Sequence, residues 1–421
     1  MHNTGTTGRS GPRRFLILYA DFGAGHRMAA KGLQAAFERR WPSSTVVQVT
    51  NPLDDRSAPR FLRIAGRWYD RGVTLSPMVY RWAYALASWK PCSELIEGVL
   101  MPLIAQSLRR ALLRFDPDAV VATHPLFLTP LTGLFALGRR PLPTYVVVTD
   151  LTKVAPMWFN PGADRTFVPT TLVAQEAVGA GLQPERVQVT GIPVHPDFAL
   201  GTPSKAELRA RLGWDPRRVT ALVVGSPRSR NIAETIHCLN QSDLPLQLVS
   251  VAGGDRRVYE KLETMQWRMP HVVYDRVDNM PELLRASDLV ISKAGGLIAS
   301  EALAAGIPML LVDVIQGQEA GNAEYILAHQ AGELAHRPSQ SVDILRHWLN
   351  AEAAELRHRS FHAGTLGQPR AAYAIADSIR EDPCMDAHGL HAYKNIVKLL
   401  ARMPQRDQLV WSLPQTAIRQ S

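Results

Sequence analysis

The sequence has few cysteines and no long apolar run. Its three cysteines stand far apart, at positions 92, 238 and 384, with no second cysteine or histidine cluster nearby. That spacing is typical neither of a disulfide framework nor of a zinc site, and it favours a reducing compartment such as the cytoplasm. No stretch approaches the roughly 20 apolar residues of a membrane-spanning helix. The apolar run at residues 15–20 is also too short for a signal-peptide core, so we expect neither a signal peptide nor a transmembrane helix.

Acidic residues are scarce in the first half of the chain. Residues 1–200 hold 22 Lys and Arg against 14 Asp and Glu, so this half carries most of the net charge of +9. Whatever acidic surface the protein meets is therefore expected to meet the first half. Hydrophobic residues at 46% are typical of a globular protein with a substantial core.

Apolar runs alternate with helical patterns along the chain. Strands are predicted at residues 15–20, 119–123, 144–150, 220–225, 246–252, 288–292 and 308–313. A long helix is predicted over 95–114, with apolar side chains inward at positions 96, 99, 100, 103, 108 and 112, and Asp116-Pro117 ends it. Such alternation indicates α/β domains with doubly wound parallel sheets. The Pro- and Gly-rich segment 190–205 separates two such domains, and the ligand is expected in the cleft between them.

The first predicted strand leads into the turn FGAGH, residues 22–26, with glycines at positions 23 and 25. A dinucleotide site is not expected, because the third glycine of the fingerprint and the acid after the second strand are both missing. Instead His26, with an ordinary pKa near 6.5, suits a general base. Asp150, at the end of the strand 144–150, is the second candidate base. The alternative for His26 is a structural histidine that caps the helix.

A second turn, within residues 288–327, has the features of an anion site. Gly295 and Gly296 follow a strand and precede a helix, whose free N–H groups and dipole suit a diphosphate. Glu301, one turn into that helix, could accept hydrogen bonds from ribose hydroxyls. Gln318 and Glu319, at the start of the next helix, could hold sugar hydroxyls. The alternative is a packing turn with solvated polar side chains.

The motifs KAGGLIASEALAAGIP and QGQEAGNAEY resemble the nucleotide-sugar half of glycosyltransferase family 28, and most closely the monogalactosyl- and glucosyl-diacylglycerol synthases. FGAGH, THPL, VTDL, PMWF, DRTFVPT and GIPV, between residues 22 and 194, also fall in that family's order. The resemblance spans roughly residues 14–380. It implies the GT-B fold, in which two Rossmann-like domains face each other across a cleft. It also implies inverting transfer of a hexose, galactose or glucose, from a UDP-sugar to diacylglycerol, with no cofactor.

The sequence pattern and the resemblance together predict four segments, and the resemblance implies the roles of single residues. Residues 1–14 are expected to be a disordered tail, 15–200 an acceptor- and membrane-facing domain, 201–365 the nucleotide-sugar domain, and 366–421 helices that cross back, with a basic tail. His26 is placed beside the acceptor, Glu301 at the ribose, and Gln318 and Glu319 near the donor sugar. The remaining expected site residues are Asn322 on the donor side and Gly25, His124 and Trp158 on the acceptor side.

One loop departs from the family pattern. Where the family has a glycine-rich loop against the phosphates, this chain has VVGSPRSRN, residues 223–231. Gly225 remains, but Ser226 and Pro227 replace glycines, and a proline lacks an N–H donor. Side chains of Ser226, Arg228 and Arg230 are expected to compensate, since arginine binds phosphate well. The departure leaves a non-catalytic lipid- and nucleotide-binding protein as one alternative. A UDP-GlcNAc-dependent transferase to another lipid and a UDP-sugar epimerase are the others.

Residues 56–90 combine seven Lys and Arg with seven aromatics and one acid. Arginines at 56, 60, 63, 67 and 71 form a predicted helical stripe, beside an apolar face that includes Phe61 and Trp68. Together with Arg63 and Arg67, these aromatics predict peripheral binding to anionic lipids at the cytoplasmic face of a membrane. The helical pattern at 393–403 is a second candidate contact. The alternative is a helix packed on the domain with a solvated arginine face.

Two further interpretations of the sequence are unfavourable. A basic patch also suits nucleic acid, but no recognition motif accompanies it, so no nucleic-acid partner is expected. The DxD-like Asp116-Pro117-Asp118 lies between a helix and a strand, where a turn is favoured over a metal site, and no metal is expected.

Overall fold

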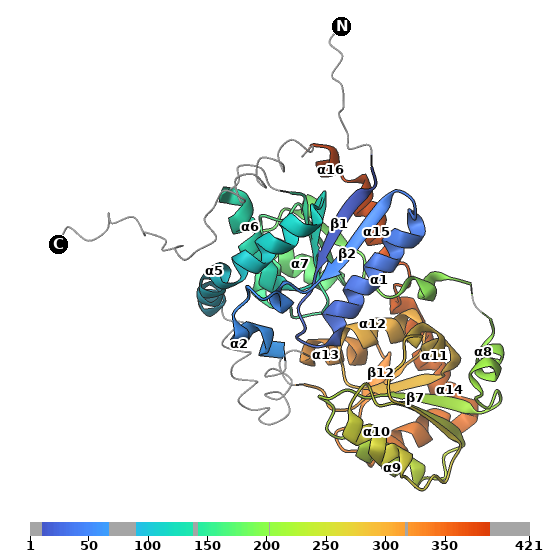
Figure 1. Ribbon diagram of the computed structural model, residues 1–421. Coiled ribbons are helices and arrows are strands. Elements are labelled where there is room, and N and C mark those ends of the chain that lie inside the picture. The colour runs from blue at the N-terminus through green and yellow to red at the C-terminus, as the bar shows by residue number, and fades with distance from the viewer. Residues whose placement is uncertain (1–10, 67–89, 138–141, 202, 316–318, 388–421) are drawn as a thin grey trace.

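The computed structural model describes residues 11–66, 90–137, 142–201, 203–315 and 319–387. Four predicted features lie outside these residues: most of the N-terminal tail, the membrane residues Arg67 and Trp68, the donor residue Gln318, and the segment 393–403. The described chain forms two domains, one above the other in Figure 1, each built around one parallel sheet.

The N-terminal sheet has six parallel strands in the order β2-β1-β3-β4-β5-β6. They are β1 (Arg13–Leu18), β2 (Thr45–Thr50), β3 (Ala119–Ala122), β4 (Thr144–Val147), β5 (Arg165–Val168) and β6 (Val187–Val189). β1 starts before the predicted residue 15, because Arg13 and Arg14 pair with Thr45 and Val46 of β2. The last two residues of the predicted tail 1–14 therefore belong to the sheet.

The C-terminal sheet also has six parallel strands, in the order β12-β11-β10-β7-β8-β9. They are β7 (Val219–Val224), β8 (Leu246–Val251), β9 (His271–Tyr274), β10 (Leu289–Ser292), β11 (Met309–Leu311) and β12 (Gly332–Leu334). The two parallel sheets, flanked by helices, confirm the predicted fold class. Two of the strands missing from the prediction, β6 and β12, have three residues each and lie at sheet edges, where the apolar run is weak. β5 is also missing, although it lies inside the sheet between β4 and β6, because only two of its four residues are apolar.

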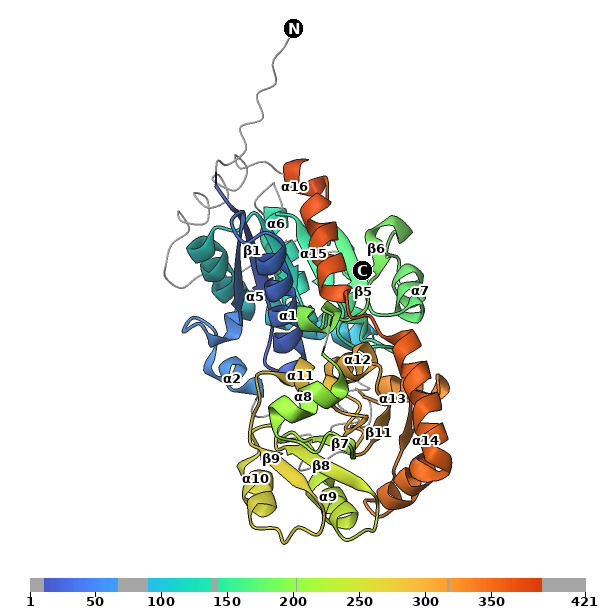
Figure 2. The same cartoon turned by 90° about the vertical axis from the view of Figure 1, so that its right-hand side faces the viewer.

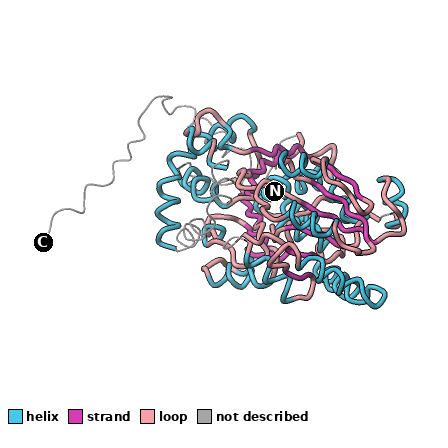
Figure 3. The backbone as a smooth tube through the Cα atoms, turned by 90° about the horizontal axis from the view of Figure 1, so that it is seen from below, coloured by secondary structure: helices cyan, strands magenta, loops and turns pink. Residues whose placement is uncertain are grey.

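Helices surround the strands of both domains (Figure 3). Those of the N-terminal domain are α1 (Ala24–Arg40), α2 (Arg60–Arg63), α5 (Lys90–Phe115), α6 (Leu128–Leu137) and α7 (Thr171–Gly179). Those of the C-terminal domain are α8 (Lys205–Leu212), α9 (Ile232–Asn240), α10 (Arg256–Glu263), α11 (Met280–Ala286), α12 (Gly296–Ala304), α13 (Ala320–Ala328) and α14 (Gln340–Leu366). Because both faces of each sheet are covered, strand residues such as Leu16 and Ile17 are fully buried.

Helix α5 corrects one detail of the prediction. It ends at Phe115, before the Asp116-Pro117 turn, as expected. Val99, however, is 58% exposed instead of facing inward. The inward face follows positions 100, 104, 108 and 112, and a residue one position before this series is rotated by about 100° around the helix.

The chain returns from the C-terminal to the N-terminal domain at its end (Figure 2). After α14, the helix α15 (Ala371–Glu381) lies beside α1, and α16 (Cys384–Ala387) follows. Ala372, Ile375 and Ile379 share a hydrophobic cluster with Phe15 and Ile17 of β1. α15 is therefore part of the N-terminal core and ties the two domains together.

Candidate active site

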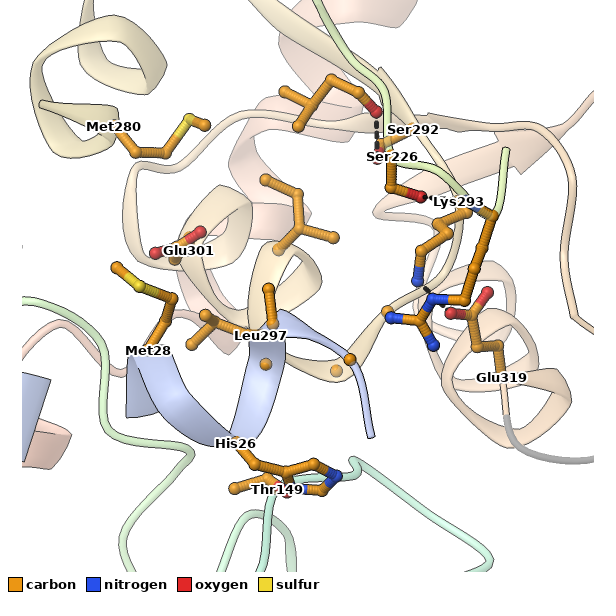
Figure 4. A pocket seen from close by; sticks show the side chains of 18 of the residues that line it. His26, Met28, Thr149, Ser226, Met280, Ser292, Lys293, Leu297, Glu301 and Glu319 are labelled. Carbon is orange, nitrogen blue, oxygen red and sulfur yellow. Dashed lines mark hydrogen bonds and ion pairs between the residues drawn. The ribbon is translucent and has the colours of Figure 1, made fainter. Parts of the chain in front are cut away.

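A cavity of about 270 Å³ lies between the two domains (Figure 4). Its walls are the segments that follow β1 and β4 in the N-terminal domain and β7 and β10 in the C-terminal domain. The strand order reverses between β1 and β3, and again between β7 and β10. In open α/β sheets, ligands bind beyond the carboxyl ends of the strands at such reversal points. The cavity is therefore where the topology predicts a ligand.

His26 lies in the first turn of α1 and is buried, with 8% of its surface exposed. Its Nδ1 is 2.9 Å from the Thr123 carbonyl oxygen and 2.8 Å from Thr149 Oγ1. Because a carbonyl only accepts hydrogen bonds, Nδ1 carries the ring proton and Nε2 keeps its lone pair. The pKa of His26 is lowered to about 4, mainly by burial and to a smaller extent by the positive charge of Arg228. The hydrogen bond to the Thr123 carbonyl acts in the opposite direction and raises the pKa. The ring is thus neutral near pH 7, although not with the ordinary pKa assumed from the sequence.

Aromatic rings pack around His26. The His124 ring lies edge-on to it at 4.5 Å, and the Trp158 ring lies at 6.2 Å. His124 Nδ1 accepts a hydrogen bond from Leu126 N at 3.2 Å, and burial, followed by the neighbouring His26, holds the pKa of His124 well below 6.5. Neither His124 nor Trp158 lines the cavity. These two predicted acceptor residues therefore lie next to His26, where their rings pack against the imidazole ring.

The two glycines of the first turn meet different neighbours. Gly23, the N-cap of α1, has φ +100°, and a Cβ atom added to it would come within 2.2 Å of Arg228 Nη2. The guanidinium of Arg228 therefore reaches across the cleft from the C-terminal domain. A Cβ atom added at Gly25 would meet only Leu297 Cβ, at an ordinary 3.7 Å. The positive φ therefore requires a glycine at 23, whereas the space around position 25 would accept a side-chain carbon.

Helix α12 presents an open N-terminus to the cavity. Gly295 is its N-cap, and among the described residues no side chain caps the helix start. Lys293 forms an ion pair with Glu319, and its Nζ would lie 3.0 Å from a Cβ atom added at Gly295. Free N–H groups and a nearby ammonium group suit a bound anion. The sequence analysis did not single out Lys293, although it is the first residue of the KAGG motif.

Gly296 has a second role in this turn. A Cβ atom added to it would come within 2.2 Å of the Thr149 carbonyl oxygen. The glycine therefore allows α12 to dock directly on the segment that follows β4 in the other domain.

Glu319 and Asn322 have most of their polar atoms engaged within the protein. Glu319 accepts hydrogen bonds from Lys293 Nζ through Oε1 and from Ile315 N through Oε2, the latter at 3.3 Å. Asn322 Oδ1 accepts from Leu151 N at 2.7 Å, and Nδ2 donates to the Ala294 carbonyl at 3.0 Å. Glu319 lines the cavity, whereas Asn322 does not. The amide of Asn322, predicted in the donor site, instead joins the two domains.

Two further acids line the cavity. Burial raises the pKa of Asp150 to about 6, and Asn322 and Lys293 lower it while Glu319 raises it. Burial raises the pKa of Glu301 to about 8, and among the described residues its carboxyl has no hydrogen-bond partner. Glu301 lies with Met28 and Met280 on one side of the cavity, and Lys293 lies on the other (Figure 4). The cavity therefore has one side with apolar side chains and a protonated acid, and one charged side.

The substituted loop after β7 is held by its own side chains. Ser226 Oγ accepts from Arg228 N at 3.3 Å and lies 3.1 Å from Ser229 Oγ. At the start of α9, Asn231 N donates to Asp313 Oδ2 at 2.6 Å. The helix that follows this loop thus already binds a carboxylate from its own chain. The open start of α12 is the better place for a ligand's phosphates.

The described part of the acceptor region is short. α2 covers four residues, in which Leu62 is buried and Phe61 is 57% exposed. Arg60 and Arg63 are exposed beside Phe61. The predicted stripe is therefore visible only up to Arg63, with an aromatic side chain at the surface next to it.

The structure describes no metal site and no membrane-spanning helix in its placed residues. No group of three or more possible metal ligands occurs among them. None of the helices placed by the structure has both the length and the apolarity to cross a bilayer. The DxD-like segment is a turn, as predicted: Asp116 has φ +52°, and Asp118 Oδ2 accepts from Arg14 N at 2.7 Å.

Family models match both domains. Residues 26–194 match the model for monogalactosyldiacylglycerol (MGDG) synthase, and residues 220–358 match the model for the glycosyltransferase family 28 C-terminal domain. A probable chloroplastic monogalactosyldiacylglycerol synthase of Glycine max is 30% identical over 380 residues, covering 88% of this chain and 71% of the relative. The chloroplastic monogalactosyldiacylglycerol synthase of Spinacia oleracea is also 30% identical, over 382 residues, 88% of this chain and 72% of the relative.

Solved structures share the fold at low identity. Acinetobacter baumannii MurG superimposes with a TM-score of 0.54 at 13% identity, covering 88% of this chain and 100% of that chain. A putative UDP-N-acetylglucosamine 2-epimerase from Listeria monocytogenes gives 0.56 at 15%, covering 88% and 96%. At such identities the likeness shows the GT-B fold alone, since one fold can carry transfer or epimerisation.

Proposed function

Since the chain belongs to the monogalactosyldiacylglycerol synthase family of glycosyltransferases, we propose that it transfers a hexose from a UDP-sugar to the free hydroxyl of diacylglycerol, with inversion at the anomeric carbon. Galactose is the first candidate for the sugar, because the relatives are named for it, and glucose is the second. One observation carries the proposal: a neutral histidine with an unprotonated Nε2 shares a cavity with a helix start that no described side chain caps.

The donor's diphosphate is proposed to bind at the start of α12. Three sources of positive charge line the same cavity: the helix N-terminus, Lys293 and the guanidinium of Arg228. Glu301, on the same helix, is proposed to accept the ribose hydroxyls, since its carboxyl is buried and unengaged among the described residues. Val277 and Met280 line the cavity and offer apolar contacts for the uracil.

The chemistry proposed is a single displacement. The acceptor hydroxyl oxygen attacks the anomeric carbon while His26 Nε2 takes its proton. The bond between the anomeric carbon and the diphosphate oxygen breaks, and UDP leaves with the electron pair. The helix start, Lys293 and Arg228 stabilise the negative charge that develops on UDP. Because these groups supply positive charge, we expect turnover without a divalent cation, with Asp150 as the second candidate base.

The acceptor is proposed to enter from a membrane surface. The exposed Phe61, with Arg60 and Arg63 beside it, fits an interfacial contact with anionic lipid. The attachment proposed is peripheral, at the cytoplasmic face.

The test is incubation of the full chain with diacylglycerol in anionic vesicles and one of three donors: UDP-galactose, UDP-glucose or UDP-GlcNAc. Lipid chromatography should show a hexosyl-diacylglycerol, formed equally well in the presence of a chelator. A product only with UDP-GlcNAc, or free UDP-sugar epimerisation without lipid product, would replace the proposal with another reaction. UDP binding by calorimetry with no product from any donor would favour the non-catalytic alternative.

A further inference from the structure

The surroundings of His26 differ from the usual arrangement of a catalytic histidine. Commonly a carboxylate accepts from the ring nitrogen opposite the reacting one and stabilises the imidazolium that forms. Among the hydrogen bonds of the described residues, none joins a carboxylate to His26. Two neutral oxygens face its Nδ1 instead: the main-chain carbonyl of Thr123 and the hydroxyl of Thr149.

We propose that Thr149 is the positioning residue of this base, and that it links the base to the donor-binding helix. The proposal rests on the function proposed above. Thr149 acts through His26: its Oγ1 accepts from Nδ1–H at 2.8 Å, so that Nε2 points away from it (Figure 4).

The hydroxyl of Thr149 has an electrostatic effect. The Thr123 carbonyl already fixes the tautomer, so the second acceptor is not needed for that purpose. When Nε2 takes the acceptor proton, the ring becomes positive in a buried site. Hydrogen bonds to a charged group are stronger than those to a neutral one, so the Thr149 oxygen stabilises the imidazolium more than the neutral ring. It therefore lowers the barrier to proton transfer.

The main chain of Thr149 makes the second contact. Its carbonyl oxygen packs on Gly296, closely enough that a Cβ atom there would approach to 2.2 Å. Gly296 is the first residue of α12, whose N-terminus is the proposed diphosphate site. One residue thus contacts the base through its side chain and the donor helix through its backbone, which fixes the distance between them.

The variants Thr149→Val and Thr149→Ser test the proposal in the full chain. Valine has the same shape without the hydroxyl, and we expect kcat to fall roughly ten- to hundredfold, because a hydrogen bond to a charged group is lost. The KM for the UDP-sugar and the affinity for UDP should stay within about twofold, because the backbone contact remains. Serine should restore most of the rate.

A matched control is Thr144→Val, at the other end of β4. Thr144 is also buried, and its hydroxyl donates to the Leu142 carbonyl at 2.9 Å, far along the strand from His26. We expect no change of kcat. A rate for Thr149→Val within about twofold of wild type would overturn the proposal. An equal loss in Thr144→Val, or no recovery with serine, would do the same.

An NMR measurement that does not depend on catalysis tests the role of Thr149 separately from the proposed function. In protein labelled with ¹⁵N-histidine, the Nδ1–H proton signal of His26, assigned through His26→Ala, should shift upfield in Thr149→Val and return in Thr149→Ser. If the wild type transfers no sugar, the proposed function fails while this signal still reports the contact. If the Nδ1–H signal were the same in wild type and Thr149→Val, the hydrogen bond between Thr149 and His26 would be disproved.

Discussion

The turn between β1 and α1 and the turn between β10 and α12 use the same backbone device for two different purposes. Each helix begins after a glycine N-cap, and among the described residues neither has a side-chain cap. At α1 the turn also lines the cavity, Arg228 lies against Gly23, and the turn holds the buried, neutral His26. At α12 the turn is open to the cavity beside Lys293.

The comparison shows that a glycine at a strand-to-helix turn indicates that another group packs closely against the backbone there. It does not indicate which group that is. At Gly23 the approaching group is an arginine of the same chain, and at Gly296 it is a carbonyl of the other domain. At Gly295 it is the ammonium group of Lys293, whose Nζ would lie 3.0 Å from an added Cβ atom, and both residues line the cavity. In the proposed function, the first turn serves the base and the second serves the donor's diphosphate. Three predictions test this division, and a fourth compares two exposed surface residues.

The largest effect is expected at the base. His26→Ala should lower kcat about 10²–10⁴-fold, the range for general-base catalysis, while UDP binding measured by calorimetry stays near wild type. Because burial lowers the pKa of His26 to about 4, the wild-type rate should not decline with a midpoint near pH 6.5. The control is Asp150→Asn, which should lower kcat by a smaller factor than His26→Ala does. A variant that melts much lower but keeps its turnover would show that His26 is structural.

The next effect is expected at the donor turn. Lys293→Ala should weaken UDP binding roughly ten- to hundredfold, because a charged partner of the diphosphate is lost. This substitution also leaves Glu319 buried and unpaired, so the double variant Lys293→Ala/Glu319→Gln is measured beside it.

The control for that prediction is Lys153→Ala. Lys153 pairs with Glu324 across the domains, but both side chains are more than half exposed, and such surface pairs contribute little. If the double variant bound UDP with wild-type affinity, the assignment of Lys293 to the donor site would be wrong.

A smaller effect separates the two kinds of glycine. Gly296→Ala should destabilise the protein by about 1–3 kcal/mol, since the added methyl group would collide with the Thr149 carbonyl. Gly25→Ala, also in the first turn of its helix, should be neutral or slightly stabilising, because its neighbour lies at 3.7 Å. Urea unfolding measures both, and equal destabilisation would contradict the assignment.

The sheets and the donor turn could be predicted because their signals are local. Apolar runs mark β1, β7 and β10, and two consecutive glycines mark the start of α12. The partners of these elements could not be predicted, because they arrive from distant positions. The Thr123 carbonyl meets His26 from 97 residues away, and Leu151 N meets Asn322 from 171 residues away. The first contact depends on how the segment after β3 packs against α1 within one domain, and the second on how the two domains dock, so no local pattern records either.

The same limit applies to the substituted loop. Its missing glycines suggested a weakened phosphate site after β7. The structure shows instead that Asp313, 82 residues further on, already occupies the start of α9. The start of α9 is thus already bound to a carboxylate of the same chain, and the replacement of glycines by Ser226 and Pro227 is not by itself a sign of lost activity.

The smallest effect is expected at the surface of the N-terminal domain, where two exposed phenylalanines allow a matched comparison. Phe61 on α2 is 57% exposed beside Arg60 and Arg63, and Phe361 on α14, in the C-terminal domain, is 69% exposed. Phe61→Ser should weaken binding to anionic vesicles by about three- to tenfold, because it removes a partly exposed ring worth about 1 kcal/mol of burial in lipid. Phe361→Ser should leave vesicle binding unchanged.

Wild-type binding should also weaken as salt rises, since the arginines next to Phe61 act through screened charge. Sedimentation with neutral and anionic vesicles measures both effects. Because Phe61 is already largely exposed, its loss should not lower the melting temperature, which separates a membrane contact from a packing defect. Equal losses for the two phenylalanines would indicate a non-specific effect of removing surface apolar area. Unchanged binding for Phe61→Ser would place the membrane contact on another part of the chain.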